Sequence, residues 1–178
     1  MTITLEENNR IRINHEIRML GQRLDKSVPT HGNIVFPATQ VASTNANTLD
    51  DYEEGTFTPS FAFGGASVGM TFGSRGGLYT KIGDTVFCHL FMVLTAKGSS
   101  TGAVTITGLP FTVGTRQAGA SIGLYEFFTG LTGVLICLAD VGGTTMRLFQ
   151  TGAASCAAIT DTSLTDTSSI YMSFNYKV

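Results

Sequence analysis

Four carboxylates occur within five positions of the segment "NANTLDDYEEGTFTPSF", residues 45–61. They are Asp50, Asp51, Glu53 and Glu54. Two such groups can serve as the acid and base of a glycosidase when they face each other across a cleft and one is desolvated. Clustered carboxylate oxygens also suit a calcium ion, although the spacing and central glycine of an EF-hand loop are absent. A third interpretation is architectural, with hydrated charges at a joint between two parts of the chain.

The composition of the segment favours the joint. The carboxylates stand in a polar stretch that offers none of the desolvation needed to raise the pKa of a catalytic acid. Tyr52 and Phe57 would anchor the joint to the domain that follows, while the carboxylates face solvent or a basic residue of a neighbouring subunit. We therefore predict a chain that is not an enzyme and that binds no metal or cofactor. The predicted joint residues are Asp50, Asp51, Tyr52, Glu53, Glu54 and Phe57.

The histidines do not complete a catalytic motif. His15 is followed by glutamate, but Met19 occupies the position where a zinc protease of the HExxH type has its second histidine. His89 lies within the apolar run "TVFCHLFMVL", residues 85–94, with its side chain on the face of Phe87 and Phe91. That run predicts a strand covered on both faces, and His89 is predicted to be a hydrogen-bonded core residue.

The cysteines and glycines also lack the spacing of known sites. Cys88, Cys137 and Cys156 are far apart and form no CxxC pair, which argues against a disulfide framework or a zinc site and predicts buried, reduced thiols. The segment "FGGASVGMTFG" lacks the lysine of a phosphate-binding loop, and there is no GxSxG elbow. No nucleophilic site is predicted.

Charge is sparse and unevenly distributed. The formal net charge of −2 gives no basic field for nucleic acid, and no apolar run is long enough for membrane insertion. Residues 1–54 hold 13 of the 24 charged residues, so the remaining 124 residues share only 11. A surface so poor in charge is covered either by hydroxyl groups or by other subunits, and the sequence leaves both explanations open.

The N-terminal segment, residues 1–26, predicts a short amphipathic helix for anchoring or oligomerisation. Its apolar stripe has the four-three-four spacing of a coiled coil, and its members are Ile13, Ile17, Leu20 and Leu24. A strand through the alternating "RIRIN" is the competing interpretation. Two heptads are too few for an isolated helix in water, so the segment needs partner helices or a docking site.

The remaining chain divides into a linker and a β-domain. Residues 27–54 combine two prolines with small polar residues and predict an extended linker that ends in the acidic joint. Residues 55–178 predict an all-β domain, an antiparallel sandwich of jelly-roll type, because short alternating runs are separated by turn signals. Those runs are "GAVTITGLP", "SIGLYEFF", "GVLICLA", "TMRLFQT" and "IYMSFNYKV", the last with Ile170, Met172, Phe174, Tyr176 and Val178 on one side.

Three blocks of this sequence occur in an order that resembles a module of tailed-bacteriophage structural proteins. They are "NTLDDYEEGTFTPSF", "GGLYTKIGDTVFCHL" and "GLPFT", and "IVFPATQV" precedes them as it commonly does in that module. The resemblance covers residues 33–113. Phe57 stands where the module usually has tryptophan, which keeps an aromatic anchor.

The resemblance implies a virion structural protein, assembled in the host bacterial cytoplasm. Such modules occur in homotrimeric tail fibres that contact host cell-surface glycans or proteins. We expect a short trimeric tail fibre, attached to a tail or baseplate protein through its N-terminus; the alternative is a capsid decoration or head-fibre protein. The receptor-binding residues are unknown, with Tyr125, Phe127 and Phe128 in "GLYEFFTG" as candidates although the core would claim most of them.

Overall fold

The computed structural model describes residues 36–39, 41, 43–45 and 47–178. The helix predicted for residues 1–26, with its stripe Ile13, Ile17, Leu20 and Leu24, lies outside the described residues. No α-helix occurs in the part that is described. Its elements are β1 (Tyr52–Phe57), β2 (Ser60–Phe63), β3 (Thr71–Ile82), β4 (Thr85–Ala96), β5 (Val104–Thr107), β6 (Ala118–Phe128), β7 (Leu135–Ala139), β8 (Thr145–Thr151), β9 (Cys156–Ala158), the 3-10 turn η1 (Asp161–Ser163) and β10 (Leu164–Lys177).

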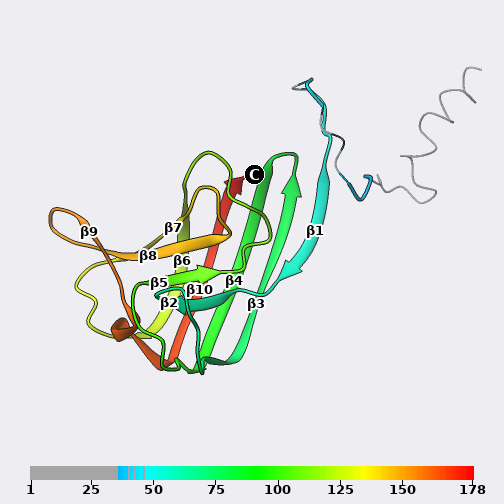
Figure 1. Cartoon of the computed structure of the whole chain (residues 1–178). Helices are drawn as coiled ribbons and strands as arrows, with labels where there is room; N and C mark the ends of the chain where they lie inside the picture. The colour runs from blue at the N-terminus through cyan, green and yellow to red at the C-terminus, as the bar shows by residue number, and fades with distance from the viewer. Residues whose placement is uncertain (1–35, 40, 42, 46) are drawn as a thin grey trace, which may run out of the picture. The chain divides into compact units, whose positions relative to one another are not determined.

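The strands form one antiparallel sheet that curls on itself. Its order is β1-β3-β4-β10-β6-β7-β8-β5-β2, and β9 pairs with β8. β1 and β2 lie at opposite ends of this path, yet only Thr58 and Pro59 separate them in the sequence. The sheet must therefore bend until its ends approach, and it forms a half-barrel in which β2 and β5 cross β4 and β10 (Figure 1).

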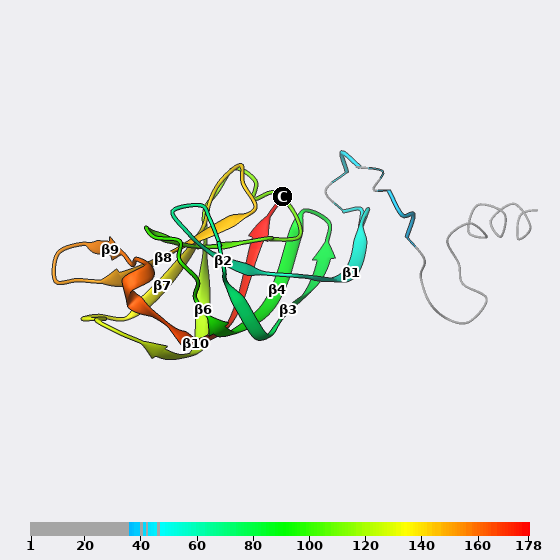
Figure 2. The same cartoon turned by 60° about the horizontal axis from the view of Figure 1, so that its bottom comes forward.

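We divide the sheet into two halves. The long-strand half consists of β1, β3, β4, β10 and β6, and the short-strand half of β7, β8, β5 and β2 with β9. Figure 2 shows the sheet turning from β10 through β6 and β7 to β8. Both halves contribute to one hydrophobic core, for example Leu90 and Ile170 from the first and Phe61, Ile106 and Leu148 from the second. Full burial of such side chains stabilises the fold by about 1.5–3 kcal/mol each.

The alternation in the sequence places these side chains. A strand turns successive side chains to opposite faces, so every second residue reaches the core. The predicted inner faces are confirmed for Val104 and Ile106 in β5, and for the series Ile170, Met172, Phe174 and Tyr176 in β10. Val178 follows the end of β10 and is exposed.

The all-β, antiparallel character is confirmed, but the sheet differs from the expected pair of separate sheets. The reason lies in β6, whose first residues Ala118 and Gly119 pair with β7 while the rest of the strand pairs with β10. A β-bulge interrupts the β6–β10 ladder, because Tyr171 pairs with Leu124 and Met172 pairs with Ile122. Bulges increase the local bend of a strand, so β6 carries the sheet around the core.

The prediction that β4 is covered on both faces is wrong for this chain by itself. Its alternate residues from Val86 to Leu94 are buried, but Phe87 is 44% exposed and His89 is also exposed. The described part of the chain places no second layer over this outer side. Apolar residues on both faces of β4 predicted that both faces are buried. In the described part of the chain the core covers the inner face, and the outer face is open to solvent.

Candidate functional site

The carboxylates of the predicted joint have separate surroundings. Asp50 Oδ2 accepts a hydrogen bond from the backbone N–H of Ser43 at 2.8 Å. Asp51 is buried within its own chain, whereas these groups were expected to face solvent or a basic residue of a neighbouring subunit, and Glu53 and Glu54 are exposed in β1. Among the described residues, no group of three or more histidine, cysteine, aspartate or glutamate side chains is arranged to hold a metal ion.

Glu53 and Glu54 each accept a hydrogen bond from a tyrosine. The Tyr79 hydroxyl donates to Glu53, and this contact with a carboxylate raises the pKa of Tyr79 to about 12. The Tyr52 hydroxyl donates to Glu54, which raises the pKa of Tyr52. Because β1 ends the sheet, its two glutamates also charge an edge that would otherwise be open to pairing with another strand.

The two predicted aromatic anchors of the joint differ in burial. Phe57 packs against the core, and its ring covers Gly77 of the neighbouring strand so closely that a Cβ at Gly77 would collide with it. Tyr52 is exposed and makes its hydrogen bond within β1. Phe57 therefore fixes β1 to the domain by packing.

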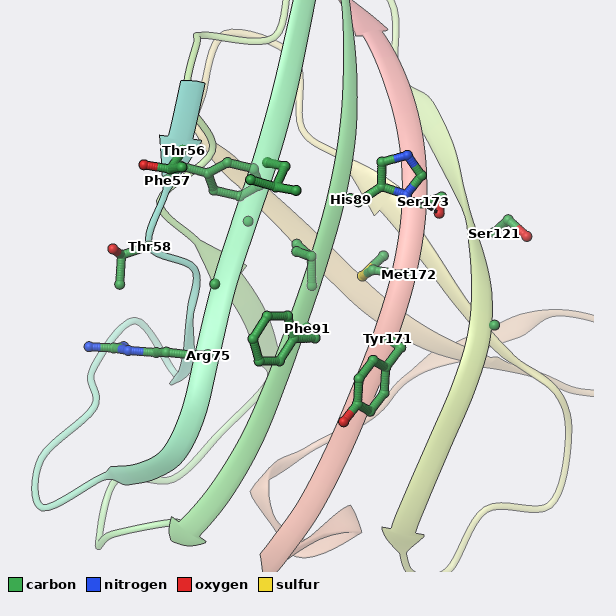
Figure 3. A pocket seen from close by; sticks show the side chains of 15 residues that line it. Thr56, Phe57, Thr58, Arg75, His89, Phe91, Ser121, Tyr171, Met172 and Ser173 are labelled. Carbon is green, nitrogen blue, oxygen red and sulfur yellow. Dashed lines mark hydrogen bonds between the residues drawn. The ribbon is translucent and has the colours of Figure 1, made fainter. Parts of the chain in front are cut away.

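A groove of about 690 Å³ runs across the outer side of the long-strand half. We call it the outer groove and define it by Leu78, His89, Phe91, Tyr171 and Ser173, which come from β3, β4 and β10. Figure 3 shows Phe91 and Tyr171 next to each other on neighbouring strands. Their rings are stacked, with centroids 5.9 Å apart and planes inclined by 16°.

His89 belongs to this groove and not to the core. It shares the outer face with Phe87 and Phe91, as predicted, but this face is open in the described chain, so the prediction of a core histidine is wrong. Its Nδ1 lies 2.8 Å from Ser173 Oγ on β10, within hydrogen-bonding distance. The predicted hydrogen-bonded state is confirmed, and its partner is a cross-strand hydroxyl.

Two of the three cysteines have the predicted environment. Cys88 and Cys137 are buried, and burial raises the pKa of both thiols to about 12. Cys156 is exposed in the short strand β9, so the prediction is wrong there. β9 pairs only with the end of β8, and all its residues are exposed.

The C-terminal end of β6 and the turn that follows it, which we call the Phe127 loop, present aromatic residues that the core does not enclose. Phe127 is 62% exposed and Tyr125 is also exposed, while Phe128 is half-buried and its ring meets Tyr125 edge to face. Phe127 has φ +59°, which is unusual for a bulky residue.

Two hydroxyls at the start of β10 hold this backbone. Ser168 Oγ donates to the Phe127 carbonyl at 2.8 Å, and Thr165 Oγ1 donates to the same oxygen at 3.0 Å. Ser168 is fully buried. The exposed ring of Phe127 is therefore carried by a fixed backbone in a sparsely populated conformation, a feature that often occurs at functional sites.

The fold is similar to part of a known phage protein. In the crystal structure of the Dettilon tailspike protein (gp208), the similar region gives a TM-score of 0.62 at 16% sequence identity. The match covers 71% of this chain and 24% of the tailspike chain, so this chain corresponds to about a quarter of that protein. At this identity the likeness concerns the fold. No family model and no curated protein matches the sequence.

Sequence reasoning missed the main outer residues. Leu78, Tyr171 and Ser173 were not singled out, although the alternation recognised in "IYMSFNYKV" already places Tyr171 and Ser173 on the side away from the core. An aromatic residue on the outward side of a strand was the available signal. No helix among the described residues is long and apolar enough to cross a membrane.

Proposed function

We propose that this protein is a non-enzymatic structural component of a tailed-bacteriophage virion. Its role is that of a short homotrimeric tail fibre whose β-domain contacts a glycan or protein on the host cell surface. The order of the "LDDYEEGTFTP", "YTKIG" and "GLPF" blocks supports a phage virion protein. The similarity of the fold to part of a phage tailspike supports the same class.

The position of the Phe127 loop is the observation that supports a role in host-cell binding. β1 begins at Tyr52, which pairs with Ile82 at the end of the sheet where β10 finishes at Lys177. Phe128 pairs with Leu164, the first residue of β10, so the Phe127 loop belongs to the opposite end. Figure 1 shows this arrangement, with the C-terminus beside the start of β1 and the end of β6 far from it.

This arrangement suits an adhesin. The linker enters the β-domain at one end, and the most exposed aromatic ring of the Phe127 loop is presented at the other. Aromatic rings dominate many recognition surfaces because they bury a large area at a small entropic cost. Three copies in one fibre would present three such rings, which raises the overall avidity when they engage together.

The N-terminal segment is the proposed anchor. Residues 1–26, through the stripe Ile13, Ile17, Leu20 and Leu24, would join the copies or dock on another virion protein. Residues 27–54 would act as linker and acidic joint to the β-domain. The partner decides between a tail fibre and the alternative, a capsid decoration protein.

The first test is binding of the fluorescently labelled full chain to cells of the phage's own host and, in parallel, to capsids that lack this protein. We expect saturable binding to cells and none to capsids. The reverse result would make the chain a decoration protein and would overturn the proposed role.

Phe127→Gly makes this test specific to the loop. Glycine adopts positive φ readily, so this variant keeps the backbone conformation and removes only the ring. We expect unchanged folding and at least a tenfold loss of cell binding, equivalent to about 1.4 kcal/mol. Val134→Gly is the matched control, because Val134 is equally exposed but lies outside the aromatic group. Unchanged binding by Phe127→Gly would remove the loop from the receptor site.

A further inference from the structure

The outward side chains of the long-strand half form cross-strand rows. Strand pairing aligns Leu78 of β3, His89 of β4 and Ser173 of β10 in one row. The next row contains Phe91, Tyr171 and Leu124 of β6. Directly opposite residues in a sheet lie about 5 Å apart, so each row is a continuous surface.

This surface carries exposed apolar groups. Leu78 is 61% exposed, Leu124 is 45% exposed and Tyr171 is 41% exposed. Phe87 extends the surface along β4 and is exposed to a similar degree. Contiguous apolar patches of this kind are uncommon on monomers and typically mark a contact with another molecule.

Charged side chains are nearly absent from its centre. The charged residues of β3 are Arg75 and Lys81. Lys81 pairs with Val86 and is buried. Arg75 lines the edge of the outer groove, where its guanidinium donates to the Pro59 carbonyl and lies over the Phe72 ring. β4 contains no aspartate, glutamate, lysine or arginine, and in β10 the stretch from Ser169 to Asn175 contains none either. Interface cores are depleted of charge and enriched in aromatic residues in the same way.

The polar groups of the surface are largely paired with each other. His89 and Ser173 lie at hydrogen-bonding distance, and Ser169 Oγ donates to Glu126 Oε2 at 3.3 Å. Covering the surface therefore buries few unsatisfied polar atoms, each of which would oppose the association.

The same features distinguish among possible occupants. Without charges at its centre, the surface has no complement for an anionic or cationic ligand. His89 and Ser173 are already paired with each other, and Leu78 and Leu124 offer a saccharide no hydrogen bonds. In a homotrimer the same side of every copy can face the three-fold axis, where its apolar side chains meet those of the other two copies and no like charges are brought together at the centre.

We propose that the outer side of the long-strand half, centred on Leu78, Phe87, Phe91 and Tyr171, is the surface through which copies of this chain pack against one another. This inference rests on the proposed homotrimer and assigns it an interface within the β-domain. The outer groove closes when the copies associate. The Phe127 loop at the end of the sheet remains available for a receptor.

A photo-crosslinking residue tests the contact directly. The full chain is prepared with p-benzoylphenylalanine at Phe87, an exposed site that tolerates a larger aromatic group, and irradiated in dilute solution. We expect covalent dimers and trimers on a denaturing gel. The matched control carries the same group at Val141, an exposed residue of the turn between β7 and β8, and should remain monomeric.

A second variant removes the contact without disturbing the core. Leu78→Glu in the Phe87-labelled chain places a charge on the outer side, and we expect at least a tenfold loss of crosslinked product. Leu78→Ser serves the same purpose if the glutamate variant does not fold. The mass of the unlabelled full chain in solution is measured alongside.

Three results would overturn the inference: a monomeric full chain, a multimeric chain without crosslinks at Phe87, or equal crosslinking at Phe87 and Val141. Protection of the Phe87 site by host polysaccharide, without crosslinks between chains, would identify a saccharide groove instead. Cell binding is measured on the same preparations. If the chain binds host cells but does not crosslink, the proposed function stands and the proposed interface is wrong. If the chain crosslinks but binds no cells, the interface stands and the proposed function is wrong.

Discussion

The outer sides of the two halves of the sheet differ although their inner sides share one core. On the short-strand half, Arg147 is paired with Asp140, with Nε and Oδ1 2.6 Å apart, and its guanidinium lies over the Phe149 ring. Thr105 and Thr107 direct their hydroxyls to backbone carbonyls of β2. On the long-strand half, the corresponding outward positions hold Leu, Phe and Tyr.

The outer side of a sheet can be solvated by water or covered by another molecule, and the two halves differ in which of these their side chains favour. Hydroxyls and ion pairs make a surface that water can solvate, whereas exposed leucine and aromatic rings gain free energy when another molecule covers them. The sequence left open whether hydroxyls or subunits cover a charge-poor surface. In this fold the first explanation applies to the short-strand half, and we propose the second for the long-strand half.

The largest expected effect concerns the thiols, which report on each region separately. Cys88 lies in the long-strand half, Cys137 in the short-strand half and Cys156 in the exposed β9. With an aromatic disulfide reagent at pH 8, we expect one fast thiol per chain and two that react at least about a thousandfold more slowly, since their exposure requires unfolding. Fast reaction of Cys137 alone would mean that the short-strand half opens by itself.

The same buried thiols give a pH dependence. Burial raises the pKa of Cys88 and of Cys137 from 9.0 to about 12. The unfolded chain therefore releases these protons first, so their contribution to stability is complete below about pH 9 and is lost as the pH rises toward 12. Urea unfolding at pH 8 and pH 11, with Cys→Ser variants as controls, checks the direction. Equal midpoints at the two pH values would contradict it.

The next effect compares two phenylalanines. Phe61 is fully buried in β2, so Phe61→Ala should lower the free energy of unfolding by about 3–5 kcal/mol. Phe87→Ala, on the outer side of β4, should cost less than about 1 kcal/mol in dilute protein but should weaken association of the copies. Urea denaturation and mass measurements separate the two effects. Equal destabilisation by both variants would show that Phe87 is packed within its own chain.

Adjacent glycines offer a smaller contrast between the two faces of β3. A Cβ on Gly77 would collide with the Phe57 ring on the inner side, whereas one on Gly76 would meet Phe91 Cε1 at 3.3 Å on the outer side. Gly77→Ala should destabilise the domain by about 1–3 kcal/mol and loosen β1, while Gly76→Ala should have the lesser effect because the exposed ring can shift. Hydrogen exchange of residues 52–57 measures the loosening. Unchanged protection of β1 in Gly77→Ala would contradict the packing role of Phe57.

The sequence predicted the strands better than their assembly. Alternation in "IYMSFNYKV" identified the inner face of β10 because burial on one side of a strand leaves a period of two. The curl of the sheet depends on β6 pairing with both β10 and β7, a long-range choice that no local pattern encodes.

The environment of the candidate site residues could also be predicted only in part from the sequence. Phe87 and Phe91 were recognised as apolar on the outer face of β4, but residue type does not say whether a cover comes from the same chain or from another. The positive φ of Phe127 was also invisible, because phenylalanine is not a signal for that conformation. The spacing of the acidic cluster matched no known motif, and the separate hydrogen-bond partners of Asp50, Glu53 and Glu54 become visible only in the structure.

The smallest expected effect lies on the short-strand half. Arg147→Gln breaks the ion pair with Asp140 while retaining a long polar side chain, and exposed pairs of this kind contribute about 0.2–1 kcal/mol. The loss should shrink further at high salt, and the mass of the assembly should not change, because this side is proposed to face water. Leu78→Gln is the counterpart on the long-strand half, where we expect little change in the unfolding of dilute protein but a marked loss of association. If Arg147→Gln dissociated the copies and Leu78→Gln did not, the contact between chains would have to be moved to the other half of the sheet.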